Sequence, residues 1–107
     1  MVRFKFIRNG KTNIGFVSSG HAGFAEAGQD IVCAAVSSAA YMAANTITDI
    51  FGAKAEAEVK DGFLSFLLTE ENAVSSQLLS GLEAHIRELA KDYPSSIKVI
   101  YGGNTNA

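Results

Sequence analysis

One cysteine and one histidine are the residues of this sequence whose types and spacing suit catalysis. His21 stands in a segment rich in glycine and alanine, and Cys33 follows twelve residues later. A thiolate is a strong nucleophile, and a neighbouring imidazole either takes the thiol proton or stabilises the thiolate as an ion pair. The pair therefore predicts nucleophilic catalysis, with Cys33 as the nucleophile and His21 as its general base and acid.

The position of Cys33 near the start of a predicted helix strengthens this hypothesis. Asp30 is a good N-cap residue, which would make Cys33 the third helical residue. Unpaired backbone N–H groups and the positive end of the helix dipole favour a thiolate there, and the same N–H groups suit an oxyanion hole. A flexible loop would let His21 fold back onto the helix. Its glycines are Gly20, Gly23 and Gly28.

Each of these residues also has an ordinary structural interpretation. Cys33 could be a small core residue of an alanine-rich helix, since unpaired cysteines are among the most buried residues. His21 could be an ordinary loop residue. Asp30 either orients His21 as the third member of a triad or only caps the helix. Ser37, one turn after Cys33, either contacts the substrate or packs within a tight helix interface.

A run of twenty residues resembles the signature of the ribosomal-processing cysteine proteases. The run, residues 20–39, reads GHAGFAEAGQDIVCAAVSSA. The family pattern is Gly-His-Ala, a short acidic loop containing glycine, then Gly-x-Asp-(Ile/Leu)-Val-Cys-Ala, with a serine four residues after the cysteine. The spacing of twelve between histidine and cysteine also agrees. The matching positions are Gly20, His21, Ala22, Gly28, Asp30, Ile31, Val32, Cys33, Ala34 and Ser37.

The resemblance implies a single cysteine endoprotease domain over residues 1–107, without cofactor or metal. In this family the substrate is the twenty-seventh protein of the large ribosomal subunit. A short N-terminal extension is removed from it, after a hydrophobic segment that ends in paired phenylalanines. The resemblance also implies Cys33 as nucleophile, His21 as base, and a homodimer. The alternative is a non-catalytic module that binds the ribosome through the same loop.

A substrate of this kind requires an apolar groove near Cys33. Phe16, Phe24 and Tyr41 are candidates for that groove by their location in the sequence. Glu26, in the loop, either contacts substrate or is a solvated charge, and His85 is predicted to face solvent among charged neighbours. One cysteine and two separated histidines do not make a set of metal ligands.

Composition restricts the class of protein and its compartment. The chain has 107 residues, 48% of them hydrophobic, which is enough for one core. A net charge of −2 argues against direct binding to nucleic acid, because such binding requires a surplus of Lys and Arg. With one cysteine, no signal-peptide core, and an apolar stretch (residues 31–44) too short to cross a bilayer, we expect a cytoplasmic protein.

Hydrophobic periodicity predicts the elements that must position the catalytic pair. Asn9-Gly10 and Asp61-Gly62 are strong signals for two-residue turns, and a helix is expected after each hairpin. We expect an α+β fold of order ββαββαβ, with two helices on one face of a mainly antiparallel sheet and a dimer covering the other face. The predicted strands are 2–8, 12–18, 55–60, 63–68 and 97–101, the helices are 30–51 and 72–92, and the tail from 102 is frayed.

Overall fold

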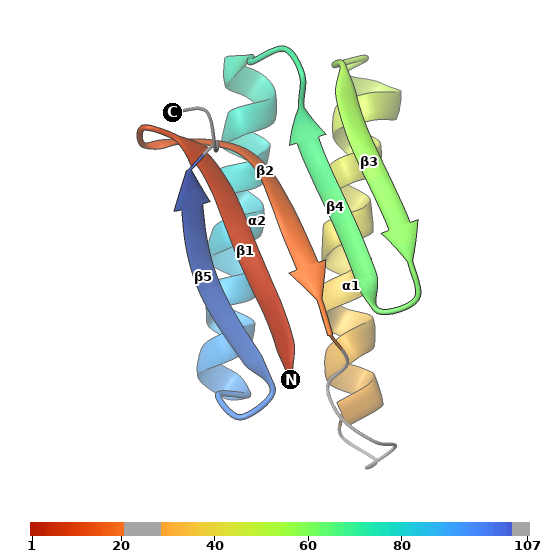
Figure 1. Cartoon of the computed structure of the whole chain (residues 1–107), viewed down its shortest axis with the longest axis vertical. Coiled ribbons are helices and arrows are strands. Elements are labelled where there is room, and N and C mark those ends of the chain that lie inside the picture. Colours follow the sequence, from red (N-terminus) through yellow and green to blue (C-terminus); the bar gives the residue numbers. More distant parts are fainter. Residues whose placement is uncertain (21–28, 104–107) are drawn as a thin grey trace.

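The computed structural model describes residues 1–20 and 29–103, which form a five-stranded sheet with two helices on one of its faces (Figure 1). This arrangement confirms the predicted α+β class, the two layers and the order ββαββαβ. The elements are β1 (Val2–Asn9), β2 (Thr12–Ser19), α1 (Gln29–Asn45), the π-helical turn η1 (Thr46–Ile50), β3 (Ala55–Lys60), β4 (Phe63–Leu68), α2 (Ala73–Asp92) and β5 (Ile97–Gly103).

The strand order in the sheet is β3-β4-β2-β1-β5. All neighbouring pairs are antiparallel except β1 and β5, which are parallel, so the sheet is mainly antiparallel as predicted. The parallel pair arises because α2 carries the chain back across the sheet between β4 and β5. Both hairpin turns have a glycine with positive φ, +63° at Gly10 and +69° at Gly62, as two-residue turns require.

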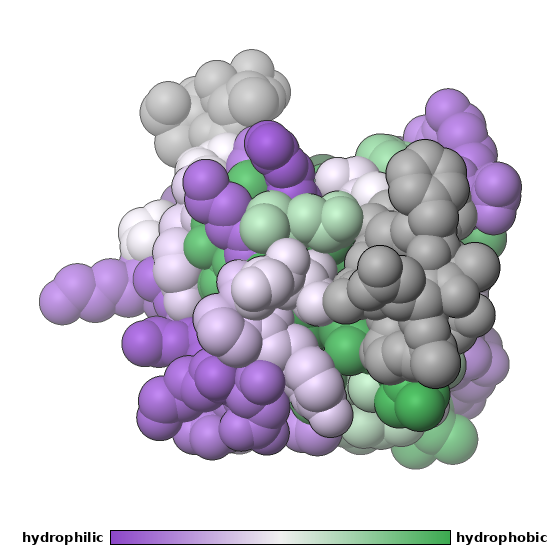
Figure 2. Space-filling view, turned by 90° about the horizontal axis from the view of Figure 1, so that it is seen from below, coloured by the Kyte–Doolittle hydropathy of each residue, from purple (hydrophilic) through white to green (hydrophobic). Residues whose placement is uncertain are grey.

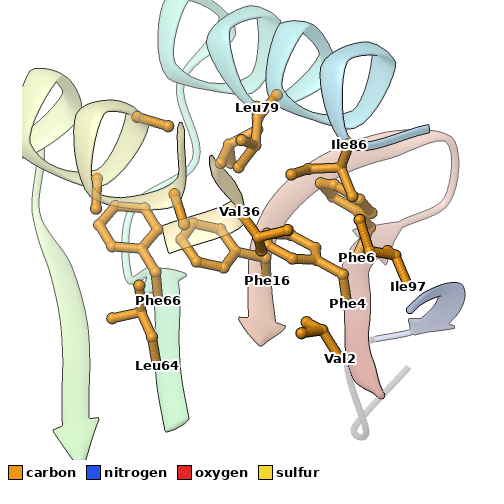
Figure 3. Close-up of a cluster of buried hydrophobic side chains, with 14 of the residues drawn as sticks. Val2, Phe4, Phe6, Phe16, Val36, Leu64, Phe66, Leu79, Ile86 and Ile97 are labelled. Carbon is orange, nitrogen blue, oxygen red and sulfur yellow. The ribbon is translucent and has the colours of Figure 1, made fainter. Parts of the chain in front are cut away.

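The core lies between the sheet and the helices and is built around four phenylalanines (Figure 3). Phe16 lies at the centre, with ring centroids 5.3 Å from that of Phe4 and 5.6 Å from that of Phe66. Helix α1 packs on these rings through small residues such as Ala40 and Ala43, both completely buried, which lets its backbone approach the sheet closely. The buried face of this helix therefore forms one side of the core.

One apolar residue in the first turn of α2, Val74, does not reach the core. Val74 is 58% exposed, whereas Leu79, Leu82 and Ile86 are buried. The inward position of the first turn is taken by Ser75, which is completely buried, so Val74 points about 100° away around the helix. The helix begins after Asn72, whose side chain accepts a hydrogen bond from the N–H of Ser75 over 2.8 Å and so caps it.

The first helix and the last strand differ from their predicted bounds. The α-helical part of the first helix ends at Asn45, and η1 continues it, with the Phe51 N–H bonded to the carbonyl of Thr46. Gly52, with φ of +67°, ends the helical segment as expected. The last strand runs to Gly103 because residues 102 and 103 pair with β1, so the prediction that they are frayed was wrong.

The helical segment Ile31–Ile50 is long and apolar enough to cross a membrane by length and composition. It is thus longer than the apolar stretch expected from the sequence. In the fold, however, Val32, Val36 and Ile47 on this segment are buried in the core against the sheet. Only 33% of the segment is buried in this way, and Ile31, Met42 and Ile50 on it are exposed.

Candidate active site

Cys33 lies in α1 at the edge of a pocket of about 260 Å³. Cys33 is partly exposed, and the buried part of the residue packs against the hydrophobic core. Four parts of the chain meet there: α1, the beginning of β1, the end of β2 and the β3–β4 turn. The residues lining the pocket are Val2, Ser18, Gly20, Cys33, Val36, Ser37, Ala40, Tyr41, Lys60, Asp61, Gly62, Phe63 and Leu64.

Figure 1 places this meeting point at the lower end of the molecule, where the N-terminus, the beginning of α1 and the β3–β4 turn come together. Seen from that end, hydrophobic surface is visible between hydrophilic side chains (Figure 2). Cys33 is thus half-buried: it packs against the core and lines the pocket, so it is not completely enclosed in the core.

The structure corrects the position of Asp30. Helix α1 already includes Gln29, so Asp30 lies inside the helix and is not its N-cap. A carboxylate is also favourable within the first turn, so aspartate is compatible with this place. Cys33 is then the fifth residue of α1 instead of the third. A triad role for Asp30 stays a prediction.

Ser37 lies one helical turn after Cys33 and lines the same pocket. Residues four positions apart project from the same face of a helix, which explains why both reach this space. Ser37 is exposed, so it does not pack tightly between helices in the described part of the chain. A contact between Ser37 and the substrate stays a prediction.

Gly20 is held tightly at the end of β2. Its N–H donates a hydrogen bond to the carbonyl oxygen of Gly62 over 2.9 Å, and its φ is +93°. A Cβ at this position would lie 2.5 Å from the carbonyl oxygen of Met1, so only glycine fits without displacement. Of the remaining sequence candidates, His21, Gly23, Phe24, Glu26 and Gly28 lie outside the described residues.

Two of the three aromatic residues proposed for a substrate groove are described, and they differ. Tyr41 lines the pocket and is 41% exposed, in agreement with the prediction. Phe16 is completely buried between Phe4 and Phe66, so its assignment to the groove was wrong. Side chains along β2 alternate between the two faces of the sheet, and that of Phe16 points to the face covered by the helices. His85 is exposed on α2, as predicted.

Sequence reasoning missed the β3–β4 turn as a part of the site. Residues 60–64 lie about thirty positions after Cys33 and carry no catalytic motif. They reach the pocket because β4 pairs with β2, with Phe63 opposite Ser19, which brings the turn beside the end of β2. A hairpin signal predicts such a turn but not its neighbours in space. The strand order alone supplies that information.

A two-layer α+β domain with a partly exposed cysteine at a pocket is a suitable framework for a thiol-dependent enzyme. The model of the family described as cysteine protease Prp matches residues 1–98, so this chain belongs to that family. It is a cysteine peptidase. A curated relative is the ribosomal processing cysteine protease Prp of Bacillus subtilis (strain 168). It is 29% identical over 93 residues, which cover 80% of this chain and 83% of the relative.

Solved structures agree in fold over nearly the whole chain. The Prp protease of S. aureus with a substrate peptide has a TM-score of 0.86 and 20% identity, covering 95% of this chain and 100% of that one. The same protease with a covalently linked product peptide has a TM-score of 0.85 and 21% identity over the same shares. A protein from Streptococcus mutans has a TM-score of 0.81 and 23% identity, covering 97% of this chain and 96% of that one.

Proposed function

We propose that this cysteine protease removes the short N-terminal extension of the twenty-seventh protein of the bacterial large ribosomal subunit, in the cytoplasm. The cut follows a hydrophobic segment that ends in paired phenylalanines. The observation that carries the proposal is the pocket beside Cys33, whose described walls include the apolar side chains of Val36, Tyr41, Phe63 and Leu64. The names of the B. subtilis relative and of the S. aureus complexes support a peptide substrate related to the ribosome.

The pocket suits one or two apolar side chains next to the scissile bond. Its volume of about 260 Å³ is slightly below the range of roughly 300–1,000 Å³ that is usual for small-molecule sites. The rest of a peptide would therefore lie outside it along the surface. Burying an aromatic side chain against these walls contributes roughly 1.5–3 kcal/mol. This is enough to select a hydrophobic residue over a polar one near the cut.

The reaction in this site is acyl transfer through a thioester. The Cys33 thiolate attacks the carbonyl carbon of the scissile peptide bond, and the C–N bond then breaks while His21 gives a proton to the departing amine. Water attacks the thioester after losing a proton to His21, which releases the N-terminal extension as a carboxylic acid, and the proton on His21 returns to the sulfur to restore the thiol. The shortened ribosomal protein has already left as the amine. The reaction requires no oxidant or reductant, because every step is a substitution at carbonyl carbon.

A cleavage assay tests the substrate and the nucleophile together. Wild-type protein and Cys33→Ala are incubated with the extended ribosomal protein, and the products are identified by mass spectrometry. We expect one cut after the phenylalanine pair, absent in Cys33→Ala, whose melting temperature stays close to that of the wild type. His21→Ala should also be inactive, while His85→Ala, which changes the exposed histidine of α2, serves as the matched control. An intact substrate after incubation with reduced wild-type protein would contradict the proposal.

We also propose a homodimer formed through the open face of the sheet. By register, this face has apolar residues on its central strands, among them Ile7, Val17 and Leu67. Acidic side chains lie on the edge strand β3, and basic side chains lie toward the other edge, on β5 and its neighbour β1. A two-fold axis parallel to the strands would bring the acidic edge of one copy against the basic edge of the other. Light scattering of Val17→Glu, expected to be monomeric, tests this arrangement.

A further inference from the structure

The pocket beside Cys33 has an apolar floor and a polar rim. Its buried lining residues, each at most 7% exposed, are all hydrophobic and form the floor: Val2, Val36, Ala40 and Leu64. Ser37, Lys60 and Asp61, which also line it, are exposed and form part of the rim. A side chain that enters the pocket therefore passes polar groups first and ends against hydrocarbon, which favours an apolar side chain.

One face of α1 supplies a whole wall of this pocket. Its lining residues follow Cys33 at helical spacing, three, four, seven and eight positions later: Val36, Ser37, Ala40 and Tyr41. Because a helix rises 1.5 Å per residue, the wall from Cys33 to Ala40 is about 10 Å long. This is the length of about three residues of extended peptide. A side chain one to three residues away from a carbonyl held at Cys33 can therefore reach Ala40.

Ala40 lies at the bottom of the pocket, where a larger side chain could extend in one direction only. It is completely buried, and on its other side α1 is packed closely on the sheet. The open volume next to Ala40 is the pocket. Ala43 is equally buried and also small, but it is not among the described residues that line the pocket. A larger side chain at position 43 would meet only the packed core.

We propose that Ala40 is a specificity-determining residue of the protease, because its small side chain leaves the depth that an aromatic substrate side chain needs. The inference rests on the proposed function, which places apolar side chains on the N-terminal side of the scissile bond. A valine at position 40 would fill the bottom of the pocket and restrict it to small side chains. The change would alter which peptides react at Cys33 and leave the reactivity of the thiol itself unchanged.

Tripeptidyl chloromethyl ketones measure this selection directly. The Cys33 sulfur forms a bond to the methylene carbon of the probe while chloride leaves, and mass spectrometry counts one adduct because the chain has one cysteine. Pairs of probes carry phenylalanine or alanine at each of the three positions before the reactive group. The ratio of the two alkylation rates reports the side-chain preference, because the reactivity of the thiol affects both rates equally.

We expect the wild type to prefer phenylalanine at one of these positions at least, and Ala40→Val to lower the phenylalanine-to-alanine ratio there by at least about 10-fold. One methylene in an apolar pocket changes selection by about 10- to 200-fold. The rate with the alanine probe should stay close to that of the wild type. Ala43→Val is the matched control and should keep the wild-type ratio. Its melting temperature should fall further than that of Ala40→Val, because its added methyl groups have no pocket to enter.

An unchanged ratio in folded Ala40→Val at all three positions would overturn the inference, and so would an equal change in Ala43→Val. If Ala40→Val does not fold, Ala40→Gly and Ala43→Gly are compared with tryptophan and phenylalanine probes. Only Ala40→Gly, which deepens the pocket, should raise the tryptophan-to-phenylalanine ratio, and equal ratios in both would overturn the inference. Failure of the wild type to cut the ribosomal protein would contradict the proposed function alone, because the probes contain no ribosomal sequence.

Discussion

The guanidinium of Arg8 donates a hydrogen bond to the carboxylate of Glu83 across 2.7 Å, which connects the end of β1 to the middle of α2. The same carboxylate accepts hydrogen bonds from Tyr101 on β5, at 2.7 Å, and from Asn13 on β2, at 2.9 Å. Arg8 also lies over the ring of Tyr101, 4.3 Å from its centroid. One glutamate thus joins three strands and a helix at a distance from the catalytic pocket.

This network makes the free energy of unfolding depend on pH. Burial raises the pKa of the Glu83 carboxyl, but the hydrogen bonds from its three partners and the charge of Arg8 outweigh it and lower the pKa below the ordinary value of 4.5. A carboxyl with a lowered folded-state pKa contributes stability above its unfolded pKa and loses it as the pH falls through the folded-state value. The contribution is therefore complete above about pH 4.5 and disappears below it.

We predict that Glu83→Gln lowers the free energy of unfolding at pH 7 by about 1.5–3 kcal/mol, the range for hydrogen bonds to a charged group. Urea unfolding at several pH values measures this. The difference from the wild type should shrink as the pH is lowered below 4.5. Glu88→Gln is the control, because Glu88 has a side chain 72% exposed and contacts Lys91 at 3.6 Å, and its loss should have little effect. A pH-independent difference for Glu83→Gln would contradict the prediction.

The N-cap of α2 is a second test of stability. Asn72→Ala removes the side-chain acceptor of the 2.8 Å hydrogen bond from the N–H of Ser75. We expect the free energy of unfolding to fall by about 1 kcal/mol, measured by urea unfolding, while Asn72→Ser retains most of it. Peptidase activity should be unchanged in both variants, since Asn72 does not line the described pocket with Cys33. An equal loss for serine and alanine would show that capping is not the cause.

Phe16 and Tyr41 should have opposite phenotypes. Phe16→Ala removes a ring from the centre of the core and should cost about 3–5 kcal/mol of stability. Tyr41→Ala should leave the melting temperature nearly unchanged but raise KM for an apolar substrate, because Tyr41 is exposed at the pocket. Thermal unfolding and steady-state kinetics on the same samples compare them. A stable Phe16→Ala with a high KM would mean that the groove includes the core ring after all.

Ser37 provides a test of substrate contact. We predict that Ser37→Ala lowers kcat/KM by about 2- to 10-fold, which corresponds to one hydrogen bond of roughly 0.5–1.5 kcal/mol, without a change in melting temperature. Ser38→Ala is the neighbouring control, because Ser38 is exposed on the same helix and is not among the described residues that line the pocket. If both variants keep full activity, Ser37 has no contact with substrate.

Local signals in the sequence predict much of this protein. The two Asx-Gly turns, the periodicity of α2 and the glycine after η1 act between residues close in the chain, so they determine the element order before any tertiary contact forms. The spacing of His21 and Cys33 indicates the same chemistry as the family to which the chain belongs. The predicted start of the first helix differs from the observed one, since Asp30 was expected to be the N-cap and α1 already includes Gln29. Such differences arise because neighbouring residues are nearly equally suitable as the first residue of a helix.

The tertiary structure determined which elements lie side by side, which hydrophobic periodicity does not predict. Strand order brought the β3–β4 turn beside Gly20, and the register of β2 turned Phe16 into the core and away from the groove. The Glu83 network likewise joins residues up to 75 positions apart. Short-range patterns state which face of an element is apolar, but they contain no information on which other element covers it. Pairing between distant strands supplies that information only when the whole sheet assembles. The sequence motif could therefore be predicted from the chain, and the residues that line its pocket could not.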